Sequence, residues 1–168
     1  MNILTVQDFF LGIVYLGIIY AVAYGLKSQQ QRKGLDSKYF IGGLTAKLFG
    51  VTAFCLVYGL YYGGGDTVDY FQGTSALTNL MTEDFAAFYS IVFENELDPN
   101  WYAFNKETGY PAWHIWRDPS SFSVSRYSVL FSLLGFKSFF VTSLLTAAFT
   151  YIGMWKLYRL FTFNYPDT

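Results

Sequence analysis

Three long stretches of apolar residues constrain this chain more than any other feature of its sequence. They cover residues 9–26, 39–62 and 139–161, each close to the ~20 residues that an α-helix needs to cross a bilayer. The first, FFLGIVYLGIIYAVAYGL, has no charged residue, and the second contains Lys47, whose ammonium group can reach the nearer interface. The sequence therefore predicts an all-α integral membrane protein with three transmembrane helices.

The composition agrees with this class of protein. Of the 168 residues, 53% are hydrophobic and 14% are charged, whereas soluble domains have about 25% charged residues. A formal net charge of −1 excludes the strongly basic surface of a nucleic-acid-binding protein. The chain has one cysteine, Cys55, and one histidine, His114, so neither an intrachain disulfide nor a Cys/His zinc cluster is expected.

Loop charges predict the orientation of the three helices. Basic residues gather between the first two apolar stretches and at the end of the third: Lys27, Arg32, Lys33, Lys38, Lys156 and Arg159. Because such residues favour the cytoplasmic side, both places are predicted to be cytoplasmic and the N-terminus to lie outside. The chain then divides into residues 1–62 with two spans and a basic loop, an extracytoplasmic aromatic-rich region at 63–138, and residues 139–168 with the third span and a cytoplasmic end.

The extracytoplasmic region is predicted to form amphipathic helices at the membrane surface. Asp66 begins an apolar pattern, and Asp66-x-x-Asp69 resembles a capping box. Thr82 is predicted to cap a second helix over residues 83–93, with two acids in its first turn, where the helix dipole favours them.

The rest of this region is interrupted by prolines and glycines. Residues 94–119 are expected to be irregular because Pro99, Gly109, Pro111 and Pro119 break regular structure. A third helix is predicted over residues 124–134. Gly135 would end that helix, and Ser138 would cap the third span: these two residues mark the return of the chain to the membrane.

The turn YYGGGDTVDY, residues 61–70, offers the sharpest candidate for chemistry. Its three glycines allow a tight turn and leave room for a ligand, and Asp66 follows them at the membrane interface, where partial desolvation suits a carboxylate to general-base work. The competing interpretation is a structural aspartate at the start of a helix, and the same holds for Asp69. Glu83 and Asp84 form a second acidic pair, and two acidic places in one region could hold a divalent cation.

The cluster WHIWRD, residues 113–118, is the other candidate site. The rings of Trp113, His114 and Trp116 could contact a sugar, and Arg117 could bind a phosphate through paired hydrogen bonds, as could Arg126 further along. The competing interpretation is that the aromatic residues pack over the spans while Arg117 pairs with its neighbouring acid or with lipid headgroups.

Several of these segments together resemble a known family. GGGDTVDYF after a span, then SVSRYSVLFSLLGFKSFFVTSLL, then a span ending in GMWKLYRLF, are similar to the N-terminal part of bacterial polytopic proteins described as GT-C-type glycosyltransferases or O-antigen-polymerase-like proteins. The resemblance implies a bacterial inner-membrane protein that takes a sugar from a polyprenyl-phosphate-linked donor at the outer face. It implies that Asp66, and more weakly Asp69, acts as base or metal ligand, with Arg117 and Arg126 at the donor phosphate.

One difference from that family leaves a second function open. Its members have many more spans than three, so the chain is expected to be the N-terminal portion of such an enzyme or a small relative without catalysis. The alternative is a non-catalytic subunit of a larger membrane complex, with small residues such as Ala147 and Gly153 packing on partner helices. A transport component is disfavoured because none of the three apolar stretches contains an acid or a histidine. The expected partners are membrane lipid, a lipid-linked sugar and other membrane subunits.

Overall fold

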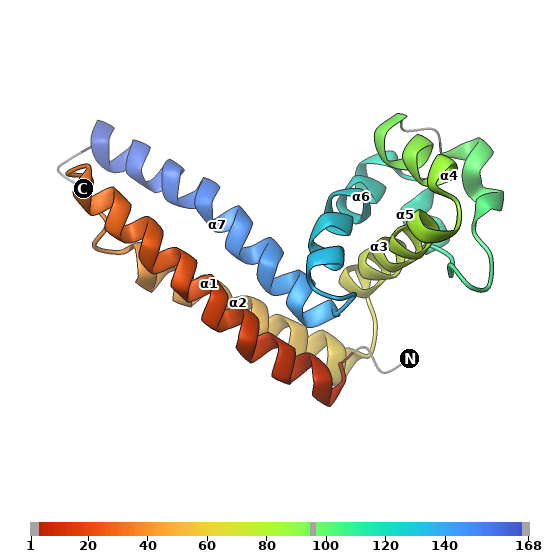
Figure 1. The fold of residues 1–168 in the computed structure, drawn as a ribbon, viewed down its shortest axis with the longest axis horizontal. Coiled ribbons are helices and arrows are strands. Elements are labelled where there is room, and N and C mark those ends of the chain that lie inside the picture. The colour runs from red at the N-terminus through yellow and green to blue at the C-terminus, as the bar shows by residue number, and fades with distance from the viewer. Residues whose placement is uncertain (1–3, 95–96, 166–168) are drawn as a thin grey trace.

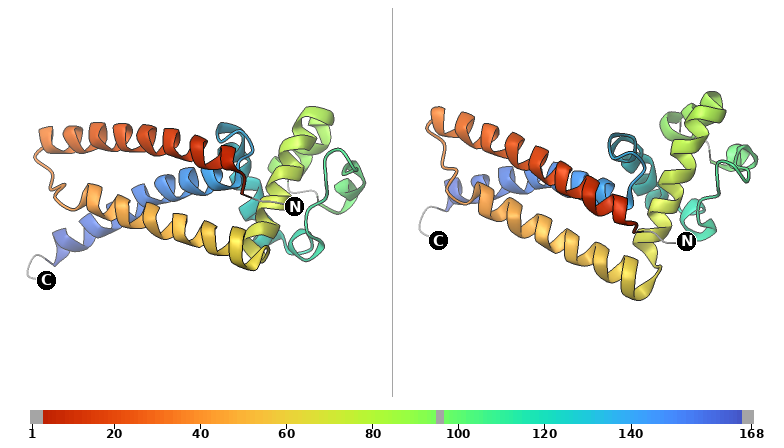
Figure 2. Two further views of the ribbon diagram at one scale, coloured as in Figure 1. Left: turned by 90° about the horizontal axis from the view of Figure 1, so that it is seen from below. Right: turned by 60° about the horizontal axis from the view of Figure 1, so that its bottom comes forward.

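The computed structural model describes residues 4–94 and 97–165, and in these ranges the chain is helical without any β-strand. Among the described residues, three helices are long and apolar enough to cross a membrane, as the sequence predicts. They are α1 (Val6–Arg32), α2 (Phe40–Leu56) with its π-helical continuation η1 (Val57–Tyr62), and α7 (Phe139–Asn164). We refer to these three helices as the candidate spans. They lie beside one another in Figures 1 and 2.

The shorter helices gather at one end of the candidate spans (Figure 1). The N-terminal end of α1 lies at this same end, whereas the α1–α2 connection and the C-terminal end of α7 lie at the other (Figures 1 and 2). These elements form what we call the end region, and their bounds are α3 (Asp66–Glu83), α4 (Phe85–Tyr89), the π-helical η2 (Ser90–Glu94), the 3-10 helix η3 (Asp98–Ala103), α5 (Trp113–Trp116) and α6 (Pro119–Leu134).

The helix starts in the end region differ from two predictions. Thr82 does not cap a helix, because α3 continues through Glu83 and the Thr82 hydroxyl donates to the Asn79 carbonyl at 2.7 Å. Asp84 is the cap of α4, and its carboxylate accepts from the Ala87 N–H at 3.0 Å. Asp84 therefore leaves the helical conformation, with φ −138°, to satisfy an otherwise unpaired N–H group.

Helix α6 also begins earlier than the predicted residue 124. Asp118 is its N-cap and Pro119 its first residue, a position where proline fits because no N–H is needed there. The predicted irregular stretch before it holds two short helices, η3 and α5. Two predictions are confirmed: Gly135 ends α6, and the Ser138 hydroxyl accepts from the Val141 N–H at 3.2 Å to cap α7.

The described residues form two hydrophobic cores. One lies among the candidate spans and includes Phe40, Leu44 and Leu144, whereas the other lies inside the end region and includes Leu77 and Phe122. Helices α3 and α6 form the main packing pair of the end region. Their close approach depends on Gly73, because a Cβ at this position would lie 2.7 Å from Ser125 Oγ. The Ser125 hydroxyl also donates to the Tyr70 carbonyl at 2.9 Å, which ties α6 to α3.

Candidate functional site

The glycine turn between η1 and α3 fixes where the candidate acids lie. Gly63 has φ 62° and Gly65 has φ 113°, backbone conformations that side-chain-bearing residues rarely adopt. A Cβ on Gly65 would also approach Tyr58 Cε1 to 3.0 Å. Because of this turn, α3 starts within four residues of the end of η1, between Tyr62 and Asp66.

Asp66 and Asp69 both lie in the first turn of α3. The predicted capping role of Asp66 is wrong, because the N-cap is Gly65 and no side chain makes a capping hydrogen bond there. Backbone hydrogen bonds form the first turn of α3 instead: the Val68 and Asp69 N–H groups donate to the Gly65 carbonyl at 2.8 and 3.1 Å. Both carboxylates lie at the N-terminal end of α3, where the partial positive charge of the helix dipole attracts acidic side chains.

His114 lies beside these two acids although it is far from them in sequence. It belongs to α5, whose neighbouring residues Ile115 and Trp116 are buried in the core of the end region, while His114 faces outward. Its Nε2 atom is 3.4 Å from Asp69 Oδ2, with 62% of the His114 side chain and 29% of the Asp69 side chain exposed. One ligand atom from each of Asp66, Asp69 and His114 lies within 4.8 Å of the other two.

This Asp66–Asp69–His114 cluster has the composition of a divalent-cation site. Carboxylate oxygens and imidazole nitrogen are common ligands of Mn²⁺, Zn²⁺ and related ions, and three protein ligands leave coordination positions open for a substrate oxygen. Within the described residues, the Asp66 carboxylate has no hydrogen-bond or ion-pair partner. Asp66 is therefore available to a cation or to a substrate hydroxyl, while Asp69 orients the imidazole.

The aromatic residues predicted to contact a substrate have different environments. Trp116 is buried at 2% exposure and packs edge-on against Phe122, so its ring belongs to the hydrophobic core. Trp113 is 55% exposed, next to His114. The Arg117 guanidinium lies 5.9 Å from the centre of the Trp113 ring, a cation–π arrangement. Trp113 and Arg117 therefore present an exposed face close to the cluster, whereas Trp116 does not.

Arg126 is engaged in holding the end region together. Its guanidinium donates to the carbonyls of Ile91 and Pro119, each at 3.4 Å, and to Ser123 Oγ at 3.0 Å. Its assignment to a donor phosphate stays a prediction that these contacts do not support.

The second acidic pair and Asp118 have structural partners. Glu83 accepts from Asn105 Nδ2 at 3.0 Å, and Asp84 caps α4. Asp118 does not pair with Arg117 among the described contacts; it accepts from the Ser120 and Ser121 N–H groups and from the Ser121 hydroxyl. The Ser121 hydroxyl, followed by these N–H groups, lowers the pKa of the Asp118 carboxyl from its usual range.

Sequence reasoning placed Asp66 and Asp69 in one site and His114 in another. The proximity of His114 to the two acids depends on how α5 packs against α3 and α6, and no spacing in the sequence encodes that contact.

Comparison of the chain with protein-family models, with curated proteins and with solved structures finds no match.

Proposed function

We propose that the chain is a multi-pass membrane protein with the end region outside the cytoplasm. Support comes from the length and apolar character of the candidate spans and from the separation of charges along them. The basic loop between α1 and α2 lies at the opposite end from the acidic cluster (Figure 1). Since basic loops favour the cytoplasmic side, this arrangement supports a location of the cluster at the outer interface of a bacterial inner membrane.

We propose further that the cluster serves a glycosyl transfer from a polyprenyl-phosphate-linked donor, as part of a GT-C-type glycosyltransferase or polysaccharide polymerase. The observation that carries this proposal is the convergence of Asp66, Asp69 and His114 at the junction of a candidate span and the end region. Two acids and an imidazole there fit a divalent cation, which when bound would neutralise charge on the donor phosphate.

Each residue of the cluster then has its own task. Asp69 and His114 hold each other in place and orient ligand atoms toward the donor phosphate. Asp66 takes the proton of the acceptor hydroxyl as that oxygen bonds to the anomeric carbon and the bond from this carbon to the phosphate oxygen breaks. Trp113 is exposed next to His114 and offers a ring face to the sugar.

The proposal is tested by Mn²⁺ binding and by glycan production. Loss of a group that only orients a ligand costs about 10–100-fold in metal affinity, and loss of a ligand should cost no less, so Asp69→Asn and His114→Gln should each weaken Mn²⁺ binding by at least about tenfold. Asp66→Asn should abolish the glycan product in producing cells with a normal level of protein, because an amide cannot accept the proton. Mn²⁺ binding to the purified full chain can be followed by electron paramagnetic resonance.

Glu107→Gln is the matched control, since Glu107 is an exposed acid of the end region outside the cluster. It should leave Mn²⁺ binding and product unchanged. Product at the wild-type rate in Asp66→Asn would exclude the catalytic role, and Mn²⁺ binding unaffected by both Asp69→Asn and His114→Gln would exclude the cation site.

A second candidate function, a subunit of a larger membrane complex, is favoured by small residues on the outer faces of two candidate spans. Each of α1 and α2 carries three exposed small residues at intervals of four, and no atom of this chain lies within 4 Å of a Cβ built on the four glycines. Such spacing permits close packing of another helix. The six residues are Gly17, Ala21 and Gly25 in α1, and Gly42, Ala46 and Gly50 in α2.

Ala147 of α7 was predicted to pack on a partner helix. This prediction is wrong, because Ala147 is buried inside the chain. The subunit function predicts that the purified chain is part of a complex. Ala46→Leu should reduce the mass of this complex, as measured by light scattering. Val14→Leu, at an exposed position outside the small-residue rows, should not. A wild-type chain that is monomeric in mild detergent would exclude this function.

A further inference from the structure

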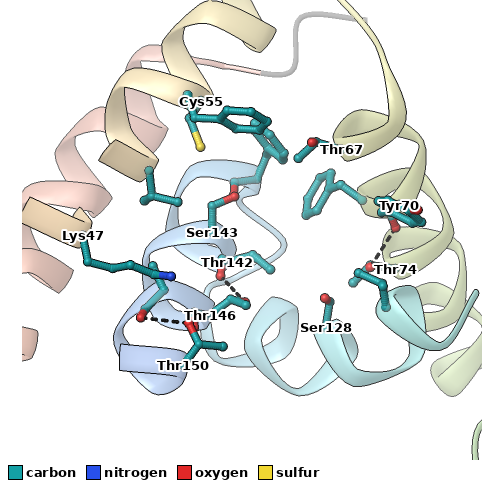
Figure 3. Close-up of a pocket in the computed structure, with 16 residues that line it drawn as sticks. Lys47, Cys55, Thr67, Tyr70, Thr74, Ser128, Thr142, Ser143, Thr146 and Thr150 are labelled. Atoms are coloured by element: carbon teal, nitrogen blue, oxygen red, sulfur yellow. Dashed lines mark hydrogen bonds between the residues drawn. The ribbon is translucent and has the colours of Figure 1, made fainter. Parts of the chain in front are cut away.

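A pocket of about 270 Å³ lies where the candidate spans meet the end region (Figure 3). Helices α2 and α7 form one side of it, and α3 and α6 form the other. Most of its wall is apolar and comes from Val51, Phe54, Phe71, Phe139 and Ala147. The Asp66–Asp69–His114 cluster is not part of its lining.

A row of hydroxyl groups on α7 runs along this pocket, and one of them lacks a partner. Thr146 and Thr150 each donate to the carbonyl four residues earlier, at 2.8 and 2.9 Å. Thr142, at 4% exposure, has no such bond. Among the buried side-chain nitrogen and oxygen atoms of the described residues, Thr142 Oγ1 is the one without a hydrogen-bond partner. A buried hydroxyl in this state is costly unless a ligand satisfies it.

Lys47 brings a positive charge to the same pocket. Its side chain extends from α2 toward α7 (Figure 3), and Nζ lies 3.4 Å from Met154 Sδ. A thioether sulfur is a weak acceptor and carries no charge. In the ranges that the structure describes, the one ion pair joins His114 to Asp69, so no carboxylate neutralises Lys47. The pocket thus holds an ammonium group and a buried hydroxyl, both of which can donate hydrogen bonds to an acceptor oxygen.

We propose that this pocket binds a single-chain amphiphile with an anionic oxygen head, such as a fatty carboxylate or an alkyl phosphate. Lys47 and Thr142 donate to its anionic oxygens, and the hydrocarbon chain lies against the apolar wall. The small volume favours one chain over a two-chain phospholipid. The inference uses the proposed membrane placement of α2 and α7 but neither sugar transfer nor the cation site.

The test measures binding of oleate and oleyl phosphate to the purified full chain in a non-ionic detergent, by displacement of a fluorescent fatty acid. Oleyl alcohol serves as the uncharged probe. Because hydrogen bonds to charged groups are the strong ones, Lys47→Met should weaken binding of an anionic probe about tenfold or more, and Lys47→Arg should weaken it less. A stronger effect on oleate than on oleyl phosphate, or the reverse, identifies the preferred head.

Thr142→Val gives a second measurement that a purely structural role cannot reproduce. Without ligand, this variant should unfold at the same temperature as the wild type or higher, because it removes a buried hydroxyl that lacks a partner. It should nevertheless bind the anionic probe several-fold more weakly. The controls are Lys156→Met and Thr52→Val, which remove a lysine and a hydroxyl from α7 and α2 outside the pocket and should leave binding unchanged.

Three results would overturn the proposal. Oleyl alcohol binding as tightly as both anionic probes would show an apolar cavity without an anion site. An equal loss of affinity in Lys156→Met and Lys47→Met would show attraction by net charge alone. Wild-type affinity in Thr142→Val would exclude the hydroxyl as a ligand group.

Discussion

The candidate spans and the end region differ in where their apolar residues lie. In the most apolar 18-residue stretch of α1, 17% of the residues are buried, and the values for α2 with η1 and for α7 are 22% and 39%. The end region instead encloses its own core, in which Leu77, Leu80, Ile91 and Phe122 are each 0% exposed. The spans therefore leave most of their apolar surface to the surroundings, whereas the end region encloses a core of its own and exposes other apolar residues such as Phe85, Phe93 and Leu130.

This difference separates two sources of stability. For the end region, burial of side chains within the chain supplies the driving force, as in a water-soluble domain. For the spans, the backbone hydrogen bonds of the helix and the apolar surroundings suffice to keep each helix intact, and contacts between helices are fewer. A mutation that deletes a large side chain should therefore matter in the core of the end region and hardly on the outward faces of the spans.

The largest expected effect is in the core of the end region. Phe122→Ala should lower the free energy of unfolding by about 3–5 kcal/mol, because it deletes a fully buried ring that packs against Trp116 at 4.8 Å between centroids. Phe10→Ala in α1, where the ring is 70% exposed, should change it by less than about 0.5 kcal/mol. Tryptophan fluorescence during denaturation of the detergent-solubilised chain measures both. A similar loss in the two variants would show that α1 is packed as closely as the end region.

A smaller effect is expected at the turn between the two parts. Gly65→Ala should cost about 1–3 kcal/mol, since alanine would be forced to φ 113° and its Cβ against Tyr58. Gly64→Ala meets no atom within 4 Å and has no positive φ, so it should be nearly neutral. Thermal unfolding compares the two variants, and Mn²⁺ binding should also fall in Gly65→Ala because Asp66 follows directly. Equal melting temperatures would show that the turn does not constrain the start of α3.

The smallest expected effect is on the pH dependence of stability, through Asp118 at the N-cap of α6. The pKa of Asp118 is lowered in the folded chain by the Ser121 hydroxyl and the N–H groups beside it. Its contribution to stability is therefore complete above the unfolded pKa, about 3.9, and is lost as the pH falls through the lower folded pKa. Asp118→Asn should keep a capping oxygen and remove this dependence, so the loss of melting temperature between pH 5 and pH 3 should be smaller than in the wild type. The same loss in both would assign the acid sensitivity to other carboxyl groups.

Much of the fold follows from the sequence because hydropathy is a local property. The three candidate spans agree with their predicted ranges within a few residues, except that α1 extends to Arg32, and Gly135 and Ser138 end and begin helices as expected. The helix starts at Asp84 and Asp118 were missed because several acids and hydroxyls near each start could serve as the cap, and only the backbone conformation selects one.

The candidate site could be predicted only in part. Asp66 and Asp69 are one helical turn apart, so their proximity follows from the sequence. The contact of Asp69 with His114, and the isolation of Thr142 from a hydrogen-bond partner, depend on how separate helices pack. Lys47 was expected to reach toward an interface. Nothing in the local sequence predicts its contact with Met154 on a neighbouring helix.

The π-helical end of the second span helps to set the direction in which the candidate acids face. In η1, Val57–Tyr62, each backbone bond encloses one residue more than in an α-helix. Because a π-helical turn takes in about one residue more than an α-helical turn, an α-helix built from the same residues would rotate everything that follows by roughly 100° about the helix axis. Asp66 and Asp69 would then face away from His114. The π-helical form of this segment is thus as much a part of the site as its apolar residues, because it sets the direction from which the chain enters α3.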